Sequence, residues 1–348
     1  MTGSTRVCVI HAAKDLRIES RPLHEPGNGE VLVRVGVGGI CGSDLHYYLD
    51  GGFGAIRVRE PLILGHEVAG TIEVLGEGVS GLAVGEAVAL NPSHPCGECV
   101  HCRAGLFHHC LNMRFWGSAM RTPHVQGGFR ERIVVKAEQC VPVGSSVSLA
   151  EAAMAEPLAV CMHAVNQAGA IAGKRVLVTG SGPIGVLSLL AARDAGAAEI
   201  IVTDVADEPL AFAQKLGATR TVNVARQTDA LAGEALDKGR IDVAFECSGN
   251  PRALAQAIEI VRPQGEIVQI GIGGAFDVPM NVVVSKELNL RGSFRFNQEF
   301  ALAAQAISTG RIDVKPLVTA THPLDRAVEA FDLAADKRVS MKVQLALG

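Results

Sequence analysis

The sequence has no excess of basic residues. Its 348 residues include 32 Lys or Arg against 36 Asp or Glu, which gives a net charge of −4 with neutral histidines. A chain with this balance offers no positive field to a phosphate backbone, so we do not expect it to bind nucleic acid.

Long apolar segments are missing as well. No stretch of about 18 residues is apolar and free of charge, as a membrane-spanning helix requires. The N-terminal segment carries Arg6, His11, Lys14 and Asp15, which leaves no apolar core for a secretory signal. The sequence therefore predicts a cytoplasmic protein that does not enter a membrane.

Aromatic residues are scarce, at 4% of the chain, whereas 48% is hydrophobic and 39 residues are glycine. This composition is typical of an α/β protein packed with small aliphatic side chains and rich in tight turns, and it argues against a disordered chain. The length is sufficient for two domains, each with its own core. We found no internal repeat and no low-complexity tract.

The first part of the chain has the pattern of short strands. Apolar residues alternate or form short blocks that are separated by glycine and proline, over residues 6–18, 30–37, 68–74, 87–90 and 129–135. The first roughly 150 residues therefore predict a mainly β, barrel-like domain.

After residue 149 the pattern changes to Ala-rich helical segments that alternate with apolar strands. Predicted strands cover 175–179, 199–204, 241–247 and 266–272, and predicted helices cover 184–195, 209–216 and 252–261. Such alternation is typical of parallel βαβ units, whose strands are buried on both faces. The C-terminal part predicts helices at 299–308 and 323–334 and strands at 312–319 and 341–347.

A glycine-rich segment follows the first of these parallel strands and opens a helix. It reads Gly180-Ser-Gly182-Pro183-Ile184-Gly185. The first glycine permits the tight turn, the second lets backbone N–H groups approach a pyrophosphate, and the third lets helix and strand pack closely. The helix N-terminus then faces the phosphate with its dipole. The alternative is an ordinary glycine-rich turn.

The next strand ends in Asp204, about 20 residues beyond the glycines, where dinucleotide-binding folds place an acidic residue. A carboxylate there hydrogen-bonds a ribose 2′-hydroxyl and repels a 2′-phosphate. No Arg or Lys stands between residues 205 and 210 to receive that phosphate. We therefore predict NAD as the cofactor, with NADP disfavoured.

Four of the nine cysteines lie within fifteen residues, as Cys96, Cys99, Cys102 and Cys110. Four thiolates suit tetrahedral zinc in a closed structural site, and the polar residues between them do not form a core pattern. We predict a structural zinc in a lobe that covers about 94–112. A nucleic-acid-binding zinc ribbon would need two separated Cys pairs and a basic face.

Three segments that lie far apart in the chain carry a second set of possible metal ligands. These ligands are Cys41, His66 with Glu67 beside it, and Glu156. A thiolate, an imidazole and a carboxylate form the type of set that holds a catalytic zinc with one position left open. Taken alone, a cysteine is more often a small buried hydrophobic residue, and a His-Glu pair more often lies on the surface without a function. Together with the cysteine cluster and the nucleotide loop, they predict a second, catalytic zinc.

These motifs resemble those of the zinc-containing medium-chain dehydrogenases. Residues 41–48, 112–120 and 290–296 resemble the polyol dehydrogenase branch of that family. The resemblance implies a Rossmann NAD-binding domain, 153–294, inserted in a GroES-like catalytic domain, 1–152 and 295–348. It also implies a homodimer or homotetramer. One departure is Pro209, which stands where polyol dehydrogenases usually carry a basic residue.

The resemblance also implies roles for further residues. Glu67 and Glu156 both belong to the catalytic zinc site, and which of the two ligates zinc directly stays open. The resemblance implies that Cys247, Ile270, Gly271 and Ile272 line the nicotinamide side of the cofactor, although ordinary turns at strand ends are the alternative. Phe294 and Arg295 are also implied to bind the cofactor. Ser43 is the first step of a proton relay with His46 as the second, or else a helix cap. Asp44 is expected to be a structural partner.

Zinc and nucleotide together predict hydride transfer from a secondary hydroxyl to NAD. The expected substrate is a sugar acid, whose carboxylate needs a cationic partner. Candidate substrate residues are Ser43, Tyr47, Arg114, Phe115, Arg121, His124 and Arg295. Open alternatives are a sorbitol, xylitol or threonine dehydrogenase and, in another class, a zinc-free quinone reductase or a binding protein without catalysis.

Overall fold

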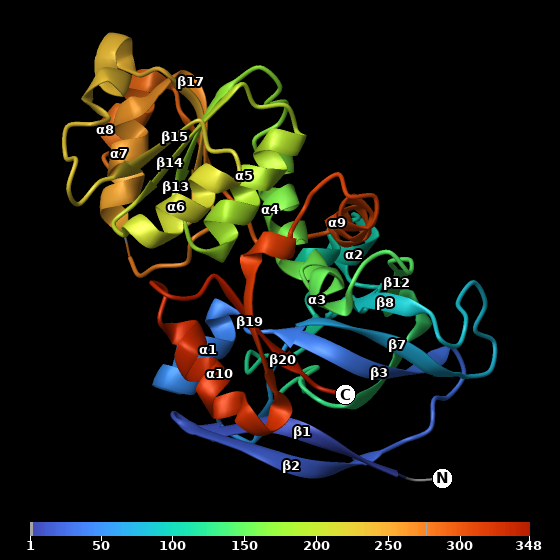
Figure 1. Cartoon of the computed structure of the whole chain (residues 1–348). Helices are drawn as coiled ribbons and strands as arrows, with labels where there is room; N and C mark the ends of the chain where they lie inside the picture. Colours follow the sequence, from blue (N-terminus) through green and yellow to red (C-terminus); the bar gives the residue numbers. More distant parts are fainter. Residues whose placement is uncertain (1–2, 276) are drawn as a thin grey trace. The chain divides into compact units, whose positions relative to one another are not determined.

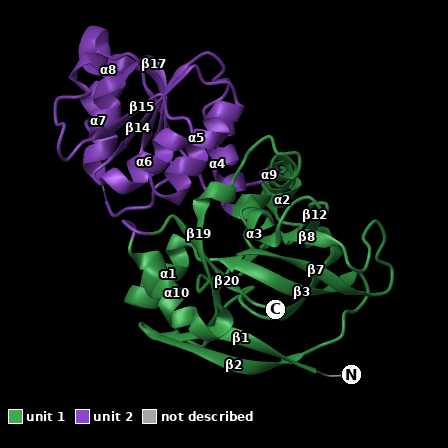
Figure 2. Cartoon of the chain, viewed as in Figure 1, with its two compact units in different colours: residues 1–156, 300–336, 340–348 green, residues 157–299, 337–339 purple. Residues whose placement is uncertain are grey.

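The computed structural model describes residues 3–275 and 277–348, and its chain forms two compact units (Figures 1 and 2). Unit 1 comprises Met1–Glu156, Phe300–Asp336 and Ser340–Gly348, and unit 2 comprises Pro157–Glu299 and Lys337–Val339. The predicted domain boundaries, 152/153 and 294/295, lie a few residues before the boundaries between the units, which are 156/157 and 299/300. Unit 2 is thus almost entirely an insertion between parts of unit 1.

Unit 1 is built mainly of β-strands. Its seven-stranded sheet has the order β12-β8-β7-β3-β20-β19, with β11 paired to β3, and a second sheet has the order β2-β1-β6. The strands are β1 (Gly3–Ala12), β2 (Asp15–Leu23), β3 (Glu30–Gly39), β4 (Gly52–Phe53), β5 (Ile56–Arg57), β6 (Leu62–Ile63), β7 (Glu67–Leu75), β8 (Ala87–Leu90), β9 (Ser93–His94), β10 (Arg114–Phe115), β11 (Arg132–Lys136), β12 (Cys140–Pro142), β19 (Val318–Pro323) and β20 (Lys342–Ala346).

Strand β3 is the centre of the large sheet and pairs with strands from both ends of the chain. It is antiparallel to β7, with Gly39 opposite Glu67, and antiparallel to β20, with Gly39 opposite Gln344. Figure 1 shows β20, from the C-terminal end, beside β3 near the N-terminal end. The start of β7 and the start of β20 therefore lie at the same end of β3.

Short helices connect and flank these strands. They are α1 (Gly42–Asp50), α2 (Val100–Arg103), α3 (Leu149–Ala152), α10 (Ala327–Ala335) and the 3₁₀ turns η1 (Phe107–His109), η2 (Ala137–Gln139), η4 (Lys315–Leu317) and η5 (Leu324–Arg326). The predicted strand over 312–319 is wrong. Asp313 accepts a hydrogen bond from the Lys315 N–H and Pro316 fixes the following turn, so the strand begins only at Val318.

Unit 2 contains a fully parallel six-stranded sheet of order β15-β14-β13-β16-β17-β18. This is the strand order 3-2-1-4-5-6 of doubly wound dinucleotide-binding folds. The strands are β13 (Arg175–Thr179), β14 (Glu199–Asp204), β15 (Arg220–Asn223), β16 (Ile241–Glu246), β17 (Val261–Gln269) and β18 (Asn289–Gly292). The predicted fold class, with a parallel α/β unit inside a mainly β unit, is confirmed.

The helices of unit 2 run between these strands. They are α5 (Pro183–Asp194), α6 (Asp207–Lys215), α7 (Pro251–Ile260), α8 (Met280–Lys286) and the 3₁₀ segment η3 (Ala232–Lys238). Helices α4 (Ala155–Gln167) and α9 (Glu299–Ser308) stand where the chain passes from one unit to the other. Strands β15 and β18 and helix α8 were absent from the sequence prediction.

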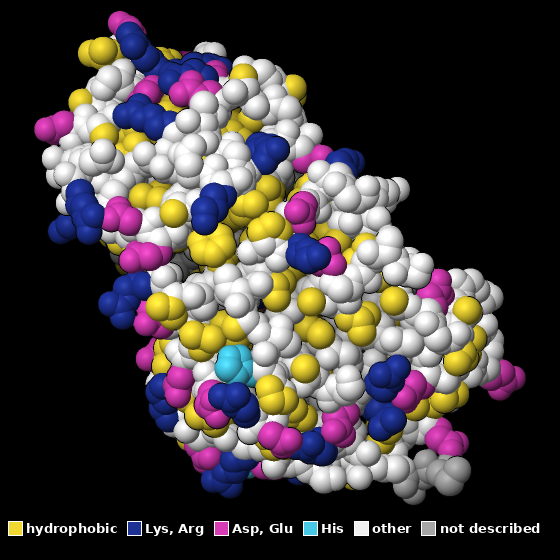
Figure 3. Space-filling model, in the orientation of Figure 1, with side chains coloured by type: hydrophobic (Ala, Val, Ile, Leu, Met, Phe, Trp, Pro, Cys, Tyr) yellow, Lys and Arg dark blue, Asp and Glu magenta, His cyan; other side chains and the backbone are white. Residues whose placement is uncertain are grey.

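Among the described residues, no helix is long and apolar enough to cross a membrane. Figure 3 shows acidic and basic side chains interspersed on the face in view. Exposed ion pairs of unit 1 include Arg17 with Asp15 and Arg326 with Glu329.

Candidate metal centre and cofactor site

Cys41 and His66 are brought together by one buried carboxylate. Cys41 is the N-cap of α1, and Asp44 in the first turn accepts a hydrogen bond from the Cys41 N–H at 3.0 Å. The other oxygen of Asp44 accepts from the Gly65 N–H at 3.2 Å. Asp44 is completely buried. It therefore joins the two segments that carry candidate ligands, as its predicted structural role requires.

The side chains of Cys41, His66 and Glu67 offer ligand atoms that all lie within 4.8 Å of one another. Nδ1 of His66 is buried without a hydrogen-bond partner and lies 3.8 Å from Asp44 Oδ1. Sulfur, nitrogen and oxygen donors at this spacing are what a catalytic zinc requires. These residues fit the predicted metal.

Glu156 is buried at the start of α4 and interacts electrostatically with the same group. Burial raises the pKa of its carboxyl to about 8; His66 opposes that rise, while Glu67 and Cys41 add to it. Burial and Glu67 likewise raise the pKa of the Cys41 thiol to about 12. Because several anionic groups raise one another's pKa in a buried space, the site favours a bound cation.

Sequence reasoning missed one residue of this site, Lys342 at the start of β20. Its Nζ lies 2.8 Å from both carboxylate oxygens of Glu67 and donates to the Ile40 carbonyl at 3.2 Å. A lysine in a terminal strand ordinarily points to solvent, and no motif surrounds it. Only the pairing of β20 with β3 reveals its position.

The predicted proton-relay residues lie on α1. Cys41, and not Ser43, occupies the N-cap position, so the capping alternative for Ser43 is wrong. His46 is exposed and lies 3.5 Å from Asp50. Tyr47 is buried and its hydroxyl accepts a hydrogen bond from the Ala119 N–H. Ser43 is half-buried, between the metal-ligand candidate Cys41 and the exposed His46.

The four clustered cysteines come together as predicted for a closed site. The sulfur of Cys99 is 3.5 Å from that of Cys102 and 4.0 Å from that of Cys110, and Cys110 is 3.5 Å from Cys96. Backbone N–H groups of Cys102 and Leu111 lower the pKa of Cys99 to about 6, whereas burial and the neighbouring Cys99 raise the pKa of Cys102 to about 12. The spacing of the four sulfurs is therefore what supports a metal site.

The predicted substrate residues of unit 1 have different surroundings. The Phe115 ring is buried, with its centre 5.5 Å from that of His66. Arg114 is exposed on β10. Arg121 donates to the carbonyls of Met113 and Leu111. His124 accepts from the Arg59 N–H through Nε2. Of the two arginines, Arg114 has the more exposed guanidinium.

Arg295 and Phe294 belong to unit 2. Arg295 has a left-handed backbone, with φ of 55°, and its guanidinium lies 4.9 Å from the centre of the Phe294 ring. Their predicted contacts with cofactor and substrate stay predictions.

The glycine-rich segment of unit 2 has the backbone that its sequence predicted. Gly180 follows β13 with φ of 83°, a conformation that favours glycine. A Cβ at Gly185 would lie 1.8 Å from the Gly180 carbonyl oxygen, so only glycine lets α5 begin here. Gly182 is the N-cap of α5 and Pro183 its first residue. This turn resembles a phosphate-binding loop.

Asp204 lies beside this loop. One of its oxygens accepts from the Ser181 N–H at 2.6 Å, and the other accepts from the Val205 and Ala206 N–H groups. The hydroxyl of Ser181 donates to the Pro209 carbonyl at 2.7 Å. Pro209, which replaces the basic residue usual in polyol dehydrogenases, thus helps to hold the glycine-rich loop through its carbonyl.

Glu246 ends β16 and joins three segments at the sheet edge that carries the glycine-rich loop, and no sequence pattern indicated this role. Its carboxylate is fully buried. It accepts hydrogen bonds from the Thr179 hydroxyl, the Ser248 and Gly249 N–H groups and the Gln269 amide. It therefore fixes the strand ends that carry Gly180, Cys247 and Ile270, where doubly wound folds bind ligands.

Comparisons with known proteins identify the family of the chain. Residues 27–145 match the alcohol dehydrogenase GroES-like domain, and residues 183–309 match the zinc-binding dehydrogenase family. L-idonate 5-dehydrogenase (NAD(P)(+)) of Escherichia coli K12 is 42% identical over 99% of both chains. Its crystal structure superposes with a TM-score of 0.96 over 100% of this chain and 99% of that one. Sorbitol dehydrogenase of Gallus gallus is 36% identical over 95% of this chain and 93% of its own.

These likenesses extend over nearly the whole chain and confirm the predicted family. They accompany a buried set of sulfur, nitrogen and oxygen donors, a four-thiolate cluster and a glycine-rich loop on a parallel sheet. The chain therefore belongs to the zinc-containing medium-chain alcohol dehydrogenases, which exchange hydride between NAD(P) and a CH–OH group.

Proposed function

We propose that this protein oxidises L-idonate at C5 to 5-keto-D-gluconate with NAD as the hydride acceptor. The observation that carries the proposal is the 42% identity to an L-idonate 5-dehydrogenase over 99% of both chains. Sorbitol dehydrogenases at 34–36% identity support a neutral polyol as the second candidate substrate.

Cys41, His66 and a carboxylate from Glu67 or Glu156 would hold the catalytic zinc. A bound zinc supplies Lewis-acid chemistry, which lowers the pKa of the substrate hydroxyl. Asp44 fixes the segments of Cys41 and His66, and Phe115 supplies an apolar wall beside the His66 ring. Ser43 would receive the hydroxyl proton and pass it toward His46 and solvent.

Unit 2 would bind and orient the cofactor. The N–H groups at the start of α5 would face the pyrophosphate, and Asp204 would accept a hydrogen bond from the adenosine ribose. Glu246 would keep the loops on the nicotinamide side in place through its buried hydrogen bonds.

The substrate assignment is tested with two arginines. Arg114→Ala should lower kcat/KM for L-idonate by roughly 10- to 100-fold, because a charge-assisted pair with the carboxylate is lost. Its kcat/KM for sorbitol should change little. Arg121→Ala is the matched control, since its guanidinium already donates to two backbone carbonyls and its loss should destabilise the loop for both substrates alike.

Catalytic efficiency on L-idonate, sorbitol, xylitol and L-threonine with NAD decides between the candidates. A wild-type preference for sorbitol would replace the idonate assignment with the polyol one. An unchanged ratio between L-idonate and sorbitol in Arg114→Ala would remove that residue as the carboxylate partner.

We also propose that the protein is a homo-oligomer and that it is located in the cytoplasm. Strand β18 is the edge of its sheet, and all four of its residues are exposed, as are Met280 and Val284 on α8. An unpaired edge with apolar neighbours is suited to covering by a second copy. All nine cysteines are free, which fits a reducing compartment.

Light scattering coupled to size exclusion measures the oligomer directly. We expect a mass of two or four 36.4 kDa chains for the wild type and a smaller assembly for Leu290→Arg. A monomeric wild type would contradict this part of the proposal.

A further inference from the structure

Arg226 lies in a turn that follows β15 in unit 2, beside the end of β14. Asn223, the last residue of β15, is buried, and its side-chain oxygen accepts hydrogen bonds from the Ala225 and Arg226 N–H groups at 3.1 and 3.3 Å. The Val224 N–H donates to the Asp204 carbonyl at 2.9 Å. The turn that carries Arg226 is therefore held next to the residue that is expected to bind the adenosine ribose.

The guanidinium of Arg226 is held by a weak contact. It forms an ion pair with Asp207, the first residue of α6, and the Asn223 amide donates to the other oxygen of the same carboxylate. The side chain of Arg226 is 74% exposed and that of Asp207 is 49% exposed. Exposed ion pairs contribute little to stability, because water screens them and long side chains lose freedom in them. Arg226 can therefore leave Asp207 for a stronger anion at small cost.

The end of β14 is otherwise acidic, since Asp204 and Asp207 both lie there. Two further basic residues stand between Asp204 and Arg226 in the sequence, namely Lys215 at the end of α6 and Arg220 at the start of β15. Because α6 connects the end of β14 to the start of the parallel strand β15, both lie at the opposite edge of the sheet. Of the three basic residues in this segment, only Arg226 lies at the edge that would bind the ribose.

The carboxylate of Asp204 leaves room for an anion beside it. It accepts hydrogen bonds from the N–H groups of Ser181, Val205 and Ala206, at 2.6, 2.7 and 3.1 Å. A carboxylate has about four lone-pair sites, so one is left for a ribose hydroxyl. The three N–H dipoles also offset part of the negative charge, which weakens the repulsion of a 2′-phosphate. A nearby cation then decides how well that phosphate is accepted.

A 2′-phosphate is the anion that suits a guanidinium at this place. Its oxygens match the paired N–H groups of arginine, and its charge strengthens the hydrogen bonds between them. The 2′-hydroxyl of NAD carries no charge and needs no cation. Arg226 therefore gains a partner from NADP that NAD does not offer.

We propose that Arg226 is a specificity-determining residue that turns from Asp207 to the 2′-phosphate of NADP. NADP then binds as the weaker of two cofactors, because Asp204 still favours NAD, and Arg226 sets the size of the difference. The inference rests on the proposed cofactor site of unit 2 and not on which hydroxyl compound is oxidised.

Arg226→Gln tests this by cofactor binding in the absence of substrate. The fluorescence of NADH and of NADPH, titrated with the protein, gives a dissociation constant for each. The constant for NADPH should rise about tenfold in the variant, because a charge-assisted pair with the phosphate is lost, and that for NADH should stay within about twofold. Arg226→Lys, which keeps the charge but not the paired N–H groups, should give an intermediate value for NADPH.

Asp207→Asn provides the second measurement. The change releases Arg226 and removes an anion, so the dissociation constant for NADPH should fall about threefold. When Arg226→Gln is already present, adding Asp207→Asn should improve NADPH binding less, because the part that acts through Arg226 is lost. An equal improvement in both backgrounds would show that the two residues act independently and would contradict the proposal.

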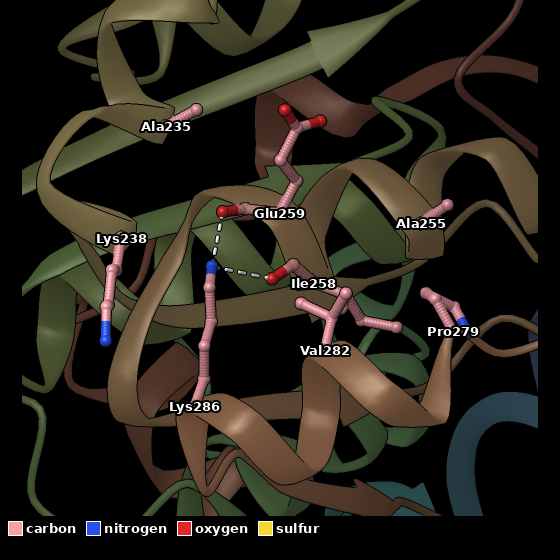
Figure 4. A pocket seen from close by; sticks show the side chains of 8 residues that line it. All are labelled: Ala235, Lys238, Ala255, Ile258, Glu259, Pro279, Val282 and Lys286. Carbon is pink, nitrogen blue, oxygen red and sulfur yellow. Dashed lines mark hydrogen bonds between the residues drawn. The ribbon is translucent and has the colours of Figure 1, made fainter.

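Two cations at the other edge of the same sheet serve as matched controls. Arg240 precedes β16 and forms an exposed ion pair with Asp237 at 2.7 Å. Lys238 lines a cavity of about 490 Å³, in which Figure 4 shows the ammonium group of Lys286 hydrogen-bonded to backbone carbonyls. Arg240→Gln and Lys238→Ala should bind NADPH as the wild type does.

An unchanged ratio of the two dissociation constants in Arg226→Gln would overturn the proposal, as would a wild type with no measurable affinity for NADPH. A wild type that binds neither nucleotide would refute the cofactor site itself and the proposal with it. Because no sugar acid enters the measurement, failure of the idonate assignment and failure of this inference are separately visible.

Discussion

At the scale of single residues, buried carboxylates do most of the positioning in both units. Asp44 joins the segments of Cys41 and His66, and Glu246 joins the ends of three strands in the parallel sheet. Neither has a cation among its hydrogen-bond partners. Each is instead satisfied by N–H or O–H donors, which is what burial of a carboxylate demands.

Asp204 should decide between the two nicotinamide dinucleotides. Because its carboxylate accepts from a ribose 2′-hydroxyl and repels a 2′-phosphate, the wild type should have a higher kcat/KM with NAD. Asp204→Ala combined with Val205→Arg should reverse or nearly abolish that preference. The comparison is kcat/KM with each cofactor.

The Asp204 oxygen that accepts from Ser181 also supports the loop. Asp204→Asn is therefore the control, since it keeps an acceptor while removing the charge. Equal efficiency with both cofactors in the wild type would show that Asp204 does not discriminate.

At the scale of elements, the start of α9 is tied to α4 by a buried polar cluster inside unit 2. Glu299 lies 3.0 Å from His163 Nδ1 and accepts from the Asn166 amide at 2.9 Å and the Asn297 N–H at 2.7 Å. Helix α4 also begins with the candidate ligand Glu156. The cluster thus anchors the helix that presents a metal-site carboxylate.

The stability of this anchor should depend on pH. Burial alone would raise the pKa of Glu299, but hydrogen bonds from His163, Asn166 and Asn297 outweigh it and hold the pKa at about 2. Because the folded-state pKa lies below the unfolded-state value near 4.5, its stabilisation is present above that value and is lost as pH falls toward 2.

Glu299→Gln should therefore unfold at a lower temperature than the wild type at pH 7. The difference between the two unfolding temperatures should become smaller as the pH falls from about 4.5 to 2. Thermal unfolding followed by circular dichroism measures it. Glu208→Gln, which changes an exposed carboxylate on α6, should show no such gap. A gap for Glu299→Gln that stayed constant with pH would mean that the charge of Glu299 is not responsible.

At the scale of the whole molecule, the two candidate metal sites are built differently. The four-cysteine cluster lies within one short segment, whereas the other site draws Cys41, His66 and Glu67 from separate segments, with Glu156 interacting electrostatically with them. A closed site stabilises a fold, and an open one supports catalysis.

The purified protein should contain two zincs per chain. Cys41→Ala should lose turnover and one zinc while its unfolding temperature stays close to that of the wild type, because the lobe is untouched. Cys99→Ala should lower the unfolding temperature by several degrees, because structural zinc contributes folding energy directly. Metal analysis of fully active protein that found one zinc per chain would contradict the assignment of roles.

Much of this protein followed from local sequence patterns. Glycine spacing around Gly180, cysteine spacing from Cys96 to Cys110 and the alternation of strands and helices all reflect short-range geometry, so the parallel sheet and both types of site could be predicted. The strand predicted at 312–319 failed because Asp313 and Pro316 favour a turn over the periodic pattern.

Only the tertiary structure revealed the residues that act across the sheets. Lys342 is 275 positions from Glu67 in the sequence, and pairing of β20 and β7 with the same strand brings their side chains to within 2.8 Å. Glu246 and Asp44 similarly gain their partners from other segments. A buried charge is defined by what surrounds it, and those surroundings come from strand register, which no local pattern encodes.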